Sequence, residues 1–311
     1  MEKFIKDFQD LERIKGQFLV GTVTKGVNNN TSAGYLNIEL RDASGSINAK
    51  KWDSTALDDQ IFVSGNVVYI EGDTNKYRDA LQLKILNASL VEQQDIDIAK
   101  LVKSAPISKE ELIDLFNKNI ESIRDNETKT LVKYLVKKFG EDVYIYPAAV
   151  SIHHEYSSGL LMHTTSMAKI ADFIAPLYDL NRDLLIAGVI LHDLAKCIEF
   201  EGPIVYKYSL EGKLLGHITL MVSEIRKAAL ELNLNSEIPL LLEHMVLSHH
   251  DKPEYGSPVP PLTKEALALT MIDNMDSKLV IVNKALETVE EGNFSNKVFA
   301  LDNRAFYKPN K

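Results

Sequence analysis

The segment Ala187-Gly-Val-Ile-Leu-His-Asp-Leu-Ala-Lys196 determines how this chain is interpreted. Its apolar residues recur at three- and four-residue intervals, which predicts a buried helix over 184–197 that ends its apolar run on His192-Asp193. An unpaired carboxylate in such a place costs on the order of several kcal/mol. One cation could be bound by both side chains, because adjacent residues of a helix project about 100° apart. A hydrogen bond between the two in an ordinary core is the alternative.

The histidines are distributed unevenly along the chain. All eight lie at or beyond residue 153, so residues 1–152 have none. Neutral imidazole is the commonest metal ligand in proteins. The distribution therefore predicts two parts, with metal chemistry in the second.

The length and composition are those of an ordinary globular protein. At 311 residues the chain exceeds the usual size of one domain, which favours two. Apolar residues make up 45% of it, enough for packed cores. The net charge of −9 argues against broad adhesion to nucleic acid or to an anionic membrane, but it leaves room for a locally basic groove.

Cysteine usage and the N-terminus indicate a cytoplasmic protein. Cys197 is the single cysteine, so an internal disulfide is excluded and a reducing compartment is favoured. A nucleophilic role for Cys197 is an alternative to the buried, unreactive thiol that we expect. Charges interrupt the apolar positions of residues 1–7, unlike a signal peptide, and no apolar run approaches the roughly 18 residues of a membrane span. We expect no membrane partner.

Residues 16–92 have the pattern of a small β-barrel. Alternating or β-rich segments bounded by turn residues occur five times, at 17–24, 35–41, 46–52, 67–72 and 81–86. The connection between the third and fourth is longer than the others. Five strands in this order predict a five-stranded Greek-key barrel of the OB type.

Barrels of this type commonly bind single-stranded nucleic acid by stacking bases on exposed aromatic rings above a cationic groove. The candidate residues are Tyr35, Trp52 and Tyr77, with Lys50, Lys51, Lys76 and Arg78 beside them. The alternative is that the rings belong to the core and the lysines to a solvated edge. Residues 1–92 hold 11 basic and 13 acidic side chains, so no overall basic field favours binding.

The rest of the chain is predicted to be helical. Residues 93–145 look like a helical connector, in which Ser108 and Glu111 have the spacing of a capping box and a second helix over 128–139 stops at Gly140. From residue 146 onward, helices alternate with short loops. The predicted fold class is therefore multi-domain, a barrel over 1–92 followed by a connector over 93–145 and an all-helical domain over 146–311.

Candidate metal ligands recur at intervals of about one helix and one loop in the helical part. In chain order they are His163, His192-Asp193, His217, His249-His250, and Asp273 or Asp276. Ligands on separate helices can converge only where those helices pack around one cleft, as in bundle sites. Repetition at this interval is hard to explain as core filling, so we expect the helices to share one site.

These residues give the chain a family resemblance. An early histidine in Gly159-Leu-Leu-Met-His-Thr164, the His192-Asp193 doublet and a late aspartate resemble the HD-domain metal-dependent phosphohydrolases. With the barrel, and with Leu247-Ser-His-His250 and Asp273-Asn-Met-Asp-Ser-Lys278, the chain is similar to the YhaM-type 3′-to-5′ exoribonucleases over nearly its whole length. One departure is Ala195, where the family more often has glycine, and it should affect packing only.

The resemblance implies a divalent-metal centre, with two ions expected. One ion would be bound by His163, His192, Asp193 and Asp273, and a second, bridged by Asp193, by His217, His249 and His250. Manganese is the first expectation, although imidazole and carboxylate ligands also suit Co²⁺, Fe²⁺, Mg²⁺ and Zn²⁺. A metal-activated water would attack phosphorus, with His192, Asp193 and Lys196 as the catalytic residues.

Other residues have assisting roles in this interpretation. Lys196 and Lys278 are candidates for phosphate contact, with ordinary surface lysines as the alternative. Asp276 would orient an imidazole from behind the ligands. His153 and His154 either contact substrate or are structural.

The resemblance implies hydrolysis of single-stranded RNA from its 3′ end, with single-stranded DNA as an alternative substrate. It also implies a homo-oligomer. A phosphodiesterase of small or cyclic nucleotides is the rival enzyme, and a noncatalytic nucleic-acid-binding scaffold with a structural metal is the third reading.

Overall fold

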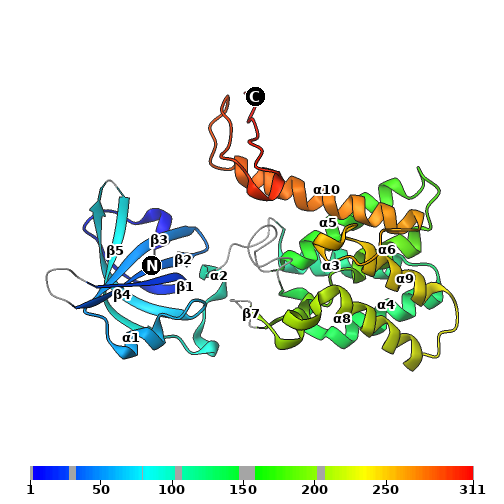
Figure 1. The fold of residues 1–311 in the computed structure, drawn as a ribbon, viewed down its shortest axis with the longest axis horizontal. Coiled ribbons are helices and arrows are strands. Elements are labelled where there is room, and N and C mark those ends of the chain that lie inside the picture. The colour runs from blue at the N-terminus through cyan, green and yellow to red at the C-terminus, as the bar shows by residue number, and fades with distance from the viewer. Residues whose placement is uncertain are drawn as a thin grey trace. The chain divides into compact units, whose positions relative to one another are not determined.

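The computed structural model describes residues 3–27, 33–78, 80–101, 107–146, 158–201 and 207–310. The chain divides into two compact units, one formed by described residues up to 101 and the other by those from 107 on. The first unit is built of strands and the second of helices (Figure 1).

The first unit is a closed five-stranded barrel. The strands close in the order β1-β2-β3-β5-β4, in which only the pairing of β3 with β5 is parallel. Their bounds are β1 Arg13–Val27, β2 Gly34–Asp42, β3 Gly45–Trp52, β4 Val67–Tyr77 and β5 Ala80–Leu90, and α1 Ala56–Ile61 lies in the long connection between β3 and β4. The predicted barrel of the OB type is confirmed, with strands longer than the sequence pattern indicated.

Period-two alternation separates the two faces of the barrel strands. In β2 the side chains of Leu36, Ile38 and Leu40 are buried in the barrel core, and the residues between them point outward. Strand β4 bends at a bulge between Glu71 and Gly72. A Cβ at Gly72 would lie 2.6 Å from the carbonyl oxygen of Lys84, so this close strand approach requires glycine.

The compact barrel unit continues past the last strand. Two short helices follow β5, η2 Gln93–Asp95 and α2 Ile98–Leu101, and Leu101 is buried against Val67 of the barrel. The amide of Ala43 donates to the carbonyl of Lys100 at 2.8 Å. The domain boundary at residue 92 stays a prediction, but any cut between the units should fall after residue 101.

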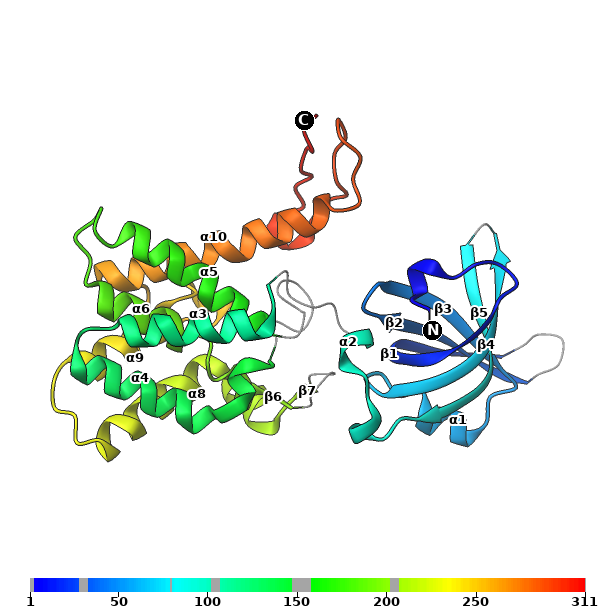
Figure 2. The ribbon, with the colours of Figure 1, turned by 180° about the vertical axis from the view of Figure 1, so that it is seen from behind.

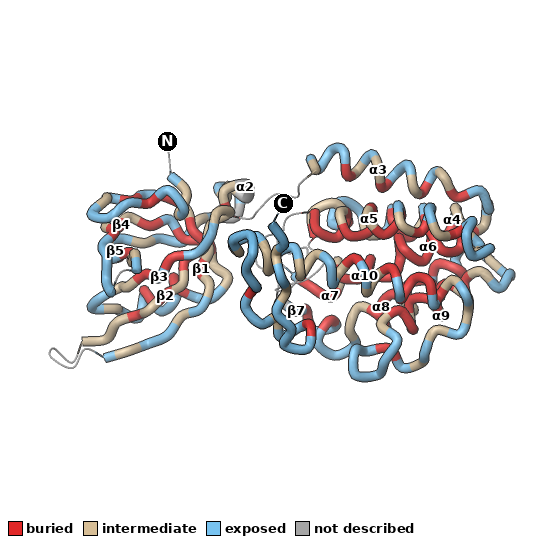
Figure 3. Tube along the Cα trace, turned by 90° about the horizontal axis from the view of Figure 1, so that it is seen from above, coloured by how far each residue is buried: buried red, intermediate tan, exposed pale blue. Residues whose placement is uncertain are grey.

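The second unit packs its helices around one hydrophobic core (Figure 3). The main helices are α3 Lys109–Ser122, α4 Asn126–Phe139, α5 Gly159–Ile174, α6 Arg182–Leu191, α8 Leu210–Glu231, α9 Ile238–Ser248 and α10 Lys264–Leu286. Short elements join them, namely η3 Gly140–Tyr144, α7 Lys196–Glu199, β6 Phe200–Glu201, β7 Lys207–Tyr208, η4 Pro253–Tyr255 and η5 Phe299–Leu301. In the described part of the chain, no helix is long and apolar enough to cross a membrane.

Helices α3 and α4 lie over one face of this unit and share its core (Figure 2). Ser108 caps α3 by accepting from the amide of Glu111, and Asp125 caps α4 in the same way for Thr128. Gly140, at φ +66°, ends α4 as the sequence predicts.

The expected helix over 184–197 is wrong in one important respect. Helix α6 ends at Leu191, and the chain turns tightly before α7 begins at Lys196. Amides in the turn donate three residues back, from Leu194 to Leu191 and from Lys196 to Asp193. His192 and Asp193 therefore stand at a helix end rather than inside a helix.

Helix α8 is kinked directly before a candidate ligand. The helix begins at Leu210 and the kink lies at Gly216, whose φ of +71° is accessible to glycine. His217 follows that kink directly.

Candidate metal centre

The structure brings together the sequence-predicted ligands of the helical unit. They come from the ends or interiors of α5, α6, α8, α9 and α10, and all are buried or half-buried. Two groups have ligand atoms within 4.8 Å of one another, namely His163, His192 and Asp193, and His217, His249 and His250. Asp273 adds a carboxylate oxygen 3.3 Å from Nε2 of His163. The two groups meet at Asp193.

Backbone carbonyls fix the tautomers of two imidazoles. Nδ1 of His192 lies 2.9 Å from the carbonyl oxygen of Val189, and Nδ1 of His249 lies 2.7 Å from that of Val246. A carbonyl can only accept, so Nδ1 carries the hydrogen in both rings. Nε2 of each therefore presents a lone pair to the site, which is the form that binds a metal.

Glu199 fixes the third imidazole. One carboxylate oxygen of Glu199 lies 3.1 Å from Nδ1 of His217, and the other accepts from the His217 amide at 3.1 Å. Burial raises the pKa of Glu199, but the hydrogen bonds to His217 outweigh this and hold the pKa below its usual value. A Cβ at Gly212 would lie 2.1 Å from the Glu199 carbonyl oxygen, so α8 packs directly on this turn.

Glu199 is a residue that the sequence interpretation missed. The sequence indicated Glu199 only indirectly. It lies one helical turn after Lys196, on a segment that already held candidate ligands. Its partner His217 lies beyond an intervening β-ribbon of β6 and β7, so the contact depends on the tertiary fold.

Asp193 faces both groups of histidines. Its Oδ1 lies 3.3 Å from Nε2 of His217, and its Oδ2 lies 3.4 Å from Nε2 of His192. Lys196 donates to Oδ2 at 2.7 Å. Burial raises the pKa of Asp193, but the charge of Lys196 and the interactions with His192 and His217 outweigh it and hold the pKa well below its ordinary value. Asp193 is thus an ionised carboxylate with one oxygen directed to each group of histidines.

Four buried ligand atoms have no hydrogen-bond partner among the described residues. They are Nε2 of His192, His217 and His249, and Oδ1 of Asp193. Each such atom costs about 1–3 kcal/mol when left unsatisfied. Since the imidazole nitrogens and the carboxylate oxygen all present lone pairs to the site, cations bound at the two groups would satisfy all four. The residues present therefore fit a divalent metal.

His163 is held by two aspartates of α10. Its Nδ1 lies 2.8 Å from Oδ2 of Asp276, while its Nε2 faces Asp273. Burial lowers the pKa of His163, but the hydrogen bonds with Asp273 and Asp276 raise it to about 9. Asp276 accepts from Nδ1, and Asp273, which attracts a proton to Nε2, would attract a cation there.

His250 stands at the more open end of the site. Its Nδ1 donates to the carbonyl of Tyr255 at 2.6 Å, which turns Nε2 away from that loop. Burial lowers the pKa of both His249 and His250, so these two imidazoles are neutral. Neutral imidazole is the ligand form.

The remaining predicted residues of the helical unit are placed differently. Lys196 is buried in its ion pair with Asp193. Lys278 is exposed and lies two residues, or about 200° around α10, beyond Asp276, so it does not join the site. Burial raises the pKa of Cys197 far above its ordinary value, which argues against a thiolate nucleophile. His153 and His154 lie outside the described residues.

On the barrel, the structure brings some of the predicted nucleic-acid contacts together. Tyr35 and Trp52 are cross-strand neighbours with ring centroids 5.1 Å apart, and the ammonium of Lys50 lies 5.2 and 4.9 Å from the two rings. The next residue, Lys51, points to the other face of β3, where its ammonium donates to the carbonyl of Leu86. Lys50, not Lys51, is the cation of this face.

Tyr77 and Arg78 lie elsewhere on the barrel, at the end of β4. Both are exposed, and the Arg78 guanidinium lies 5.4 Å from the centre of the Tyr77 ring. They form a second aromatic–cation pair at the tip of the β4–β5 hairpin.

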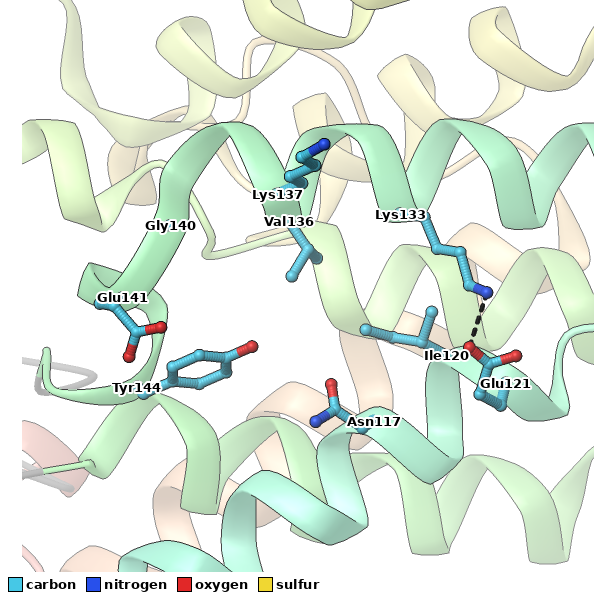
Figure 4. Close-up of a pocket in the computed structure, with 9 residues that line it drawn as sticks. All are labelled: Asn117, Ile120, Glu121, Lys133, Val136, Lys137, Gly140, Glu141 and Tyr144. Carbon is cyan, nitrogen blue, oxygen red and sulfur yellow. Dashed lines mark ion pairs between the residues drawn. The ribbon is translucent and has the colours of Figure 1, made fainter.

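A separate cavity of about 380 Å³ lies between α3, α4 and η3 (Figure 4). Its wall includes an ion pair between Lys133 and Glu121 at 2.6 Å, together with Asn117 and Tyr144. None of the candidate metal ligands lines it. The cavity is therefore not part of the metal centre.

The site and its helices are those of the HD-domain class. The family model described as "HD domain" matches residues 160–278, a range that contains every candidate metal ligand. The barrel resembles the second OB-fold domain of replication protein A from Methanococcus maripaludis, with 18% identity, 30% of this chain and 97% of that one covered, and a TM-score of 0.24.

The chain belongs to the YhaM 3′-5′ exoribonuclease family. It is 42% identical to the protein named 3′-5′ exoribonuclease YhaM from Geobacillus sp., over 99% of this chain and 96% of the relative. It is 44% identical to the protein of the same name from Bacillus subtilis, over 96% and 95%. Both units of the chain are therefore covered by the similarity.

Proposed function

We propose that this protein is a metal-dependent 3′-to-5′ exoribonuclease, which hydrolyses phosphodiester bonds from the 3′ end of single-stranded RNA. The observation that carries the proposal is the set of unpartnered imidazole nitrogens around Asp193, in a chain whose relatives over nearly full length are named 3′-5′ exoribonuclease. Single-stranded DNA remains the alternative substrate.

The ligand assignment is part of the proposal. His163, His192, Asp193 and Asp273 would hold one divalent ion, and Asp193, His217, His249 and His250 would hold the second. The two groups of converging ligand atoms and the position of Asp193 between them support this assignment. Manganese is the first candidate, since oxygen and imidazole ligands suit it.

Bound divalent ions supply an activated water and offset charge on the phosphoryl oxygens. The protein's own residues prepare the site for that chemistry. Val189, Val246 and Glu199 keep the hydrogen on Nδ1 of three imidazoles. Asp276 does the same for His163. Lys196 offsets part of the negative charge of Asp193 and restrains its orientation. Of the two lysines considered for phosphate contact, Lys196 is the one that lies at the site.

The barrel would bind the RNA strand. The outward rings of Tyr35 and Trp52 offer stacking surfaces, and Lys50 adds positive charge beside them. Tyr77 and Arg78 would extend the contact at the hairpin tip. We further propose that the protein works in the cytoplasm, as its single cysteine favours, and as a homo-oligomer, as the family resemblance implies.

The direct test incubates the purified chain with Mn²⁺ and 5′-labelled single-stranded RNA. We expect stepwise shortening of the labelled strand and no cleavage of a circular RNA of the same sequence. His192→Ala should abolish hydrolysis while leaving RNA binding mostly intact. Turnover of mononucleotides or cyclic nucleotides alone would favour the small-nucleotide phosphodiesterase. Tight binding without turnover would favour the scaffold.

A further inference from the structure

The chain ends in an arm that the metal centre does not explain. Residues 292–310, called the C-terminal arm here, fold back on themselves after α10 and project from the end of that helix (Figure 1). Backbone hydrogen bonds join its two halves, from Gly292 to Lys308 at 2.8 Å and from Val298 to Arg304 at 2.9 Å. The arm is therefore an ordered feature of the helical unit.

The arm exposes aromatic rings. Phe299 is 86% exposed, Phe294 is 66% exposed and Tyr307 is 45% exposed, although Leu301 in the same arm is buried. Three of the eleven phenylalanines are exposed, and two of these are in the arm. Large apolar side chains gathered in this way mark a binding surface.

Two of these rings form a pair like the one on the barrel. Phe294 and Tyr307 face each other across the arm, with ring centroids 5.1 Å apart and an angle of 49° between the planes. The Tyr35–Trp52 pair has a separation of 5.1 Å and an angle of 44°. The two units thus present matching aromatic platforms.

The arm is basic in an acidic chain. Between residues 292 and 310 the sequence has three basic side chains and one acidic one, Asp302, whereas the whole chain has a net charge of −9. Lys308 serves to anchor the arm, because its ammonium donates to the carbonyls of Leu286 and Val289 at the end of α10. Lys297 and Arg304 lie near the tip and are exposed, and the Arg304 guanidinium is paired with Asp302 at 3.3 Å.

We propose that the C-terminal arm is a second binding surface for single-stranded RNA, on which Phe299 and the Phe294–Tyr307 pair stack against bases while Lys297 and Arg304 contact phosphates. Exposed rings beside cations are the combination that binds single strands without sequence preference. A second copy of the chain is a poorer occupant, since pairing two arms would bring their cations together. Three acidic residues at the base, Glu287, Glu290 and Glu291, limit the phosphate contacts to the tip.

The arm is connected to the metal centre by one rigid element. Helix α10 carries Asp273 and Asp276 in its middle and the arm at its end. The ten residues from Asp276 to Leu286 span about 15 Å along the helix axis. A strand whose 3′ end lies at the metal centre can therefore extend to the arm, so the arm would hold RNA on the 5′ side of the bond to be cleaved.

The test measures the affinity of a fluorescent 20-nucleotide RNA in the His192→Ala background, where cleavage does not compete. We expect Phe299→Ala to weaken binding about five- to tenfold, the loss expected for one stacking platform. Phe173→Ala is the matched control, since Phe173 is 72% exposed on α5 but lies outside the arm. Asp302→Asn should strengthen binding. Equal affinities for Phe299→Ala and the control would overturn the proposal.

Salt dependence separates RNA binding from self-association. Arg304→Gln should reduce the slope of log affinity against log salt by about 0.7, the value for one phosphate contact of a single strand. If Phe299→Ala instead dissociates an oligomer in sedimentation and leaves RNA affinity unchanged, the arm is an interface between copies and the proposal is wrong.

A crosslinking measurement needs no variant. RNA carrying 4-thiouridine should crosslink to peptides of residues 294–307 in the intact protein, and crosslinks confined to the barrel would contradict the proposal. The choice of RNA as the ligand rests on the proposed function, but the proposal for the arm and the proposal of an exoribonuclease can fail separately. Arm variants should cleave a dinucleotide at the wild-type rate. If the wild type does not shorten single-stranded RNA with Mn²⁺ present, the exoribonuclease proposal is wrong while the binding result stands.

Discussion

His217 and Asp193 face each other with Nε2 and Oδ1 only 3.3 Å apart, yet neither atom has a hydrogen-bond partner among the described residues. The reason lies on the far side of the imidazole, where Nδ1–H of His217 donates a hydrogen bond to Glu199. Two lone pairs therefore point at one another, an arrangement that is unfavourable until a cation lies between them. This relationship is the physical basis for a metal at the second group of histidines.

Glu199 should be required for metal binding although it is not a ligand. We expect Glu199→Gln to weaken Mn²⁺ affinity and activity at limiting metal by about 10- to 100-fold, because the amide holds the His217 tautomer less firmly. Titrating Mn²⁺ should restore most of kcat. Glu201→Gln, two residues on and exposed, is the matched control and should behave as wild type. A loss that high Mn²⁺ does not restore would assign Glu199 another role.

The barrel face should depend on Lys50 and not on Lys51. Lys50→Gln should weaken single-stranded RNA binding by about two- to fivefold, from the lost cation–π and phosphate contacts at an exposed site. Lys51→Gln should leave affinity nearly unchanged, since its ammonium is bonded to the carbonyl of Leu86. Fluorescence anisotropy with one labelled RNA measures both. The reverse order of effects would place the RNA on another face.

Removal of the barrel should affect long substrates more than short ones. The cut belongs after residue 101, because Leu101 packs against Val67 of the barrel. A chain that begins at residue 107 keeps the hydrophobic core of the helical unit. We expect its rate on a long RNA to fall much further than its rate on a dinucleotide, and equal losses on both would count against a delivery role for the barrel.

Metal removal should destabilise the helical unit. Chelation leaves four buried polar atoms without partners, so saturating Mn²⁺ should stabilise this unit by roughly 3 kcal/mol, the value for a ligand at 100 times its Kd. For a unit of this size we expect a rise in Tm of about 5–10 °C. Calorimetry with EDTA and with Mn²⁺ checks this. An unchanged Tm would mean that the site does not hold the ion.

The sequence predicted the fold well because both units obey simple periodicities. The five strands alternate buried and outward residues, and the helical segments carry continuous apolar faces. The end of α6 could not be predicted, because the apolar run continues through Leu194 and Ala195 with no glycine or proline to mark the turn. The stop at Leu191 is imposed by the packing of that turn.

The candidate site was predictable to different degrees. Histidine and aspartate spacing identified the ligand set that the structure brings together. Lys51 lies at an even number of residues from the buried Ile47 and Ala49, so the alternation of the strand already placed its side chain on the opposite face from Lys50. The exposed side of Lys278 likewise followed from its position two residues beyond Asp276. Glu199 could not be found in this way, since its contact with His217 is created by tertiary packing.

The most direct test of the metal centre is a crystal structure of the protein soaked in Mn²⁺, with anomalous scattering measured at the manganese edge. We expect two anomalous peaks on either side of Asp193, as the two-ion ligand assignment requires. One should lie among His163, His192 and Asp273, and the other among His217, His249 and His250. Absence of both peaks, or manganese bound away from Asp193, would contradict it.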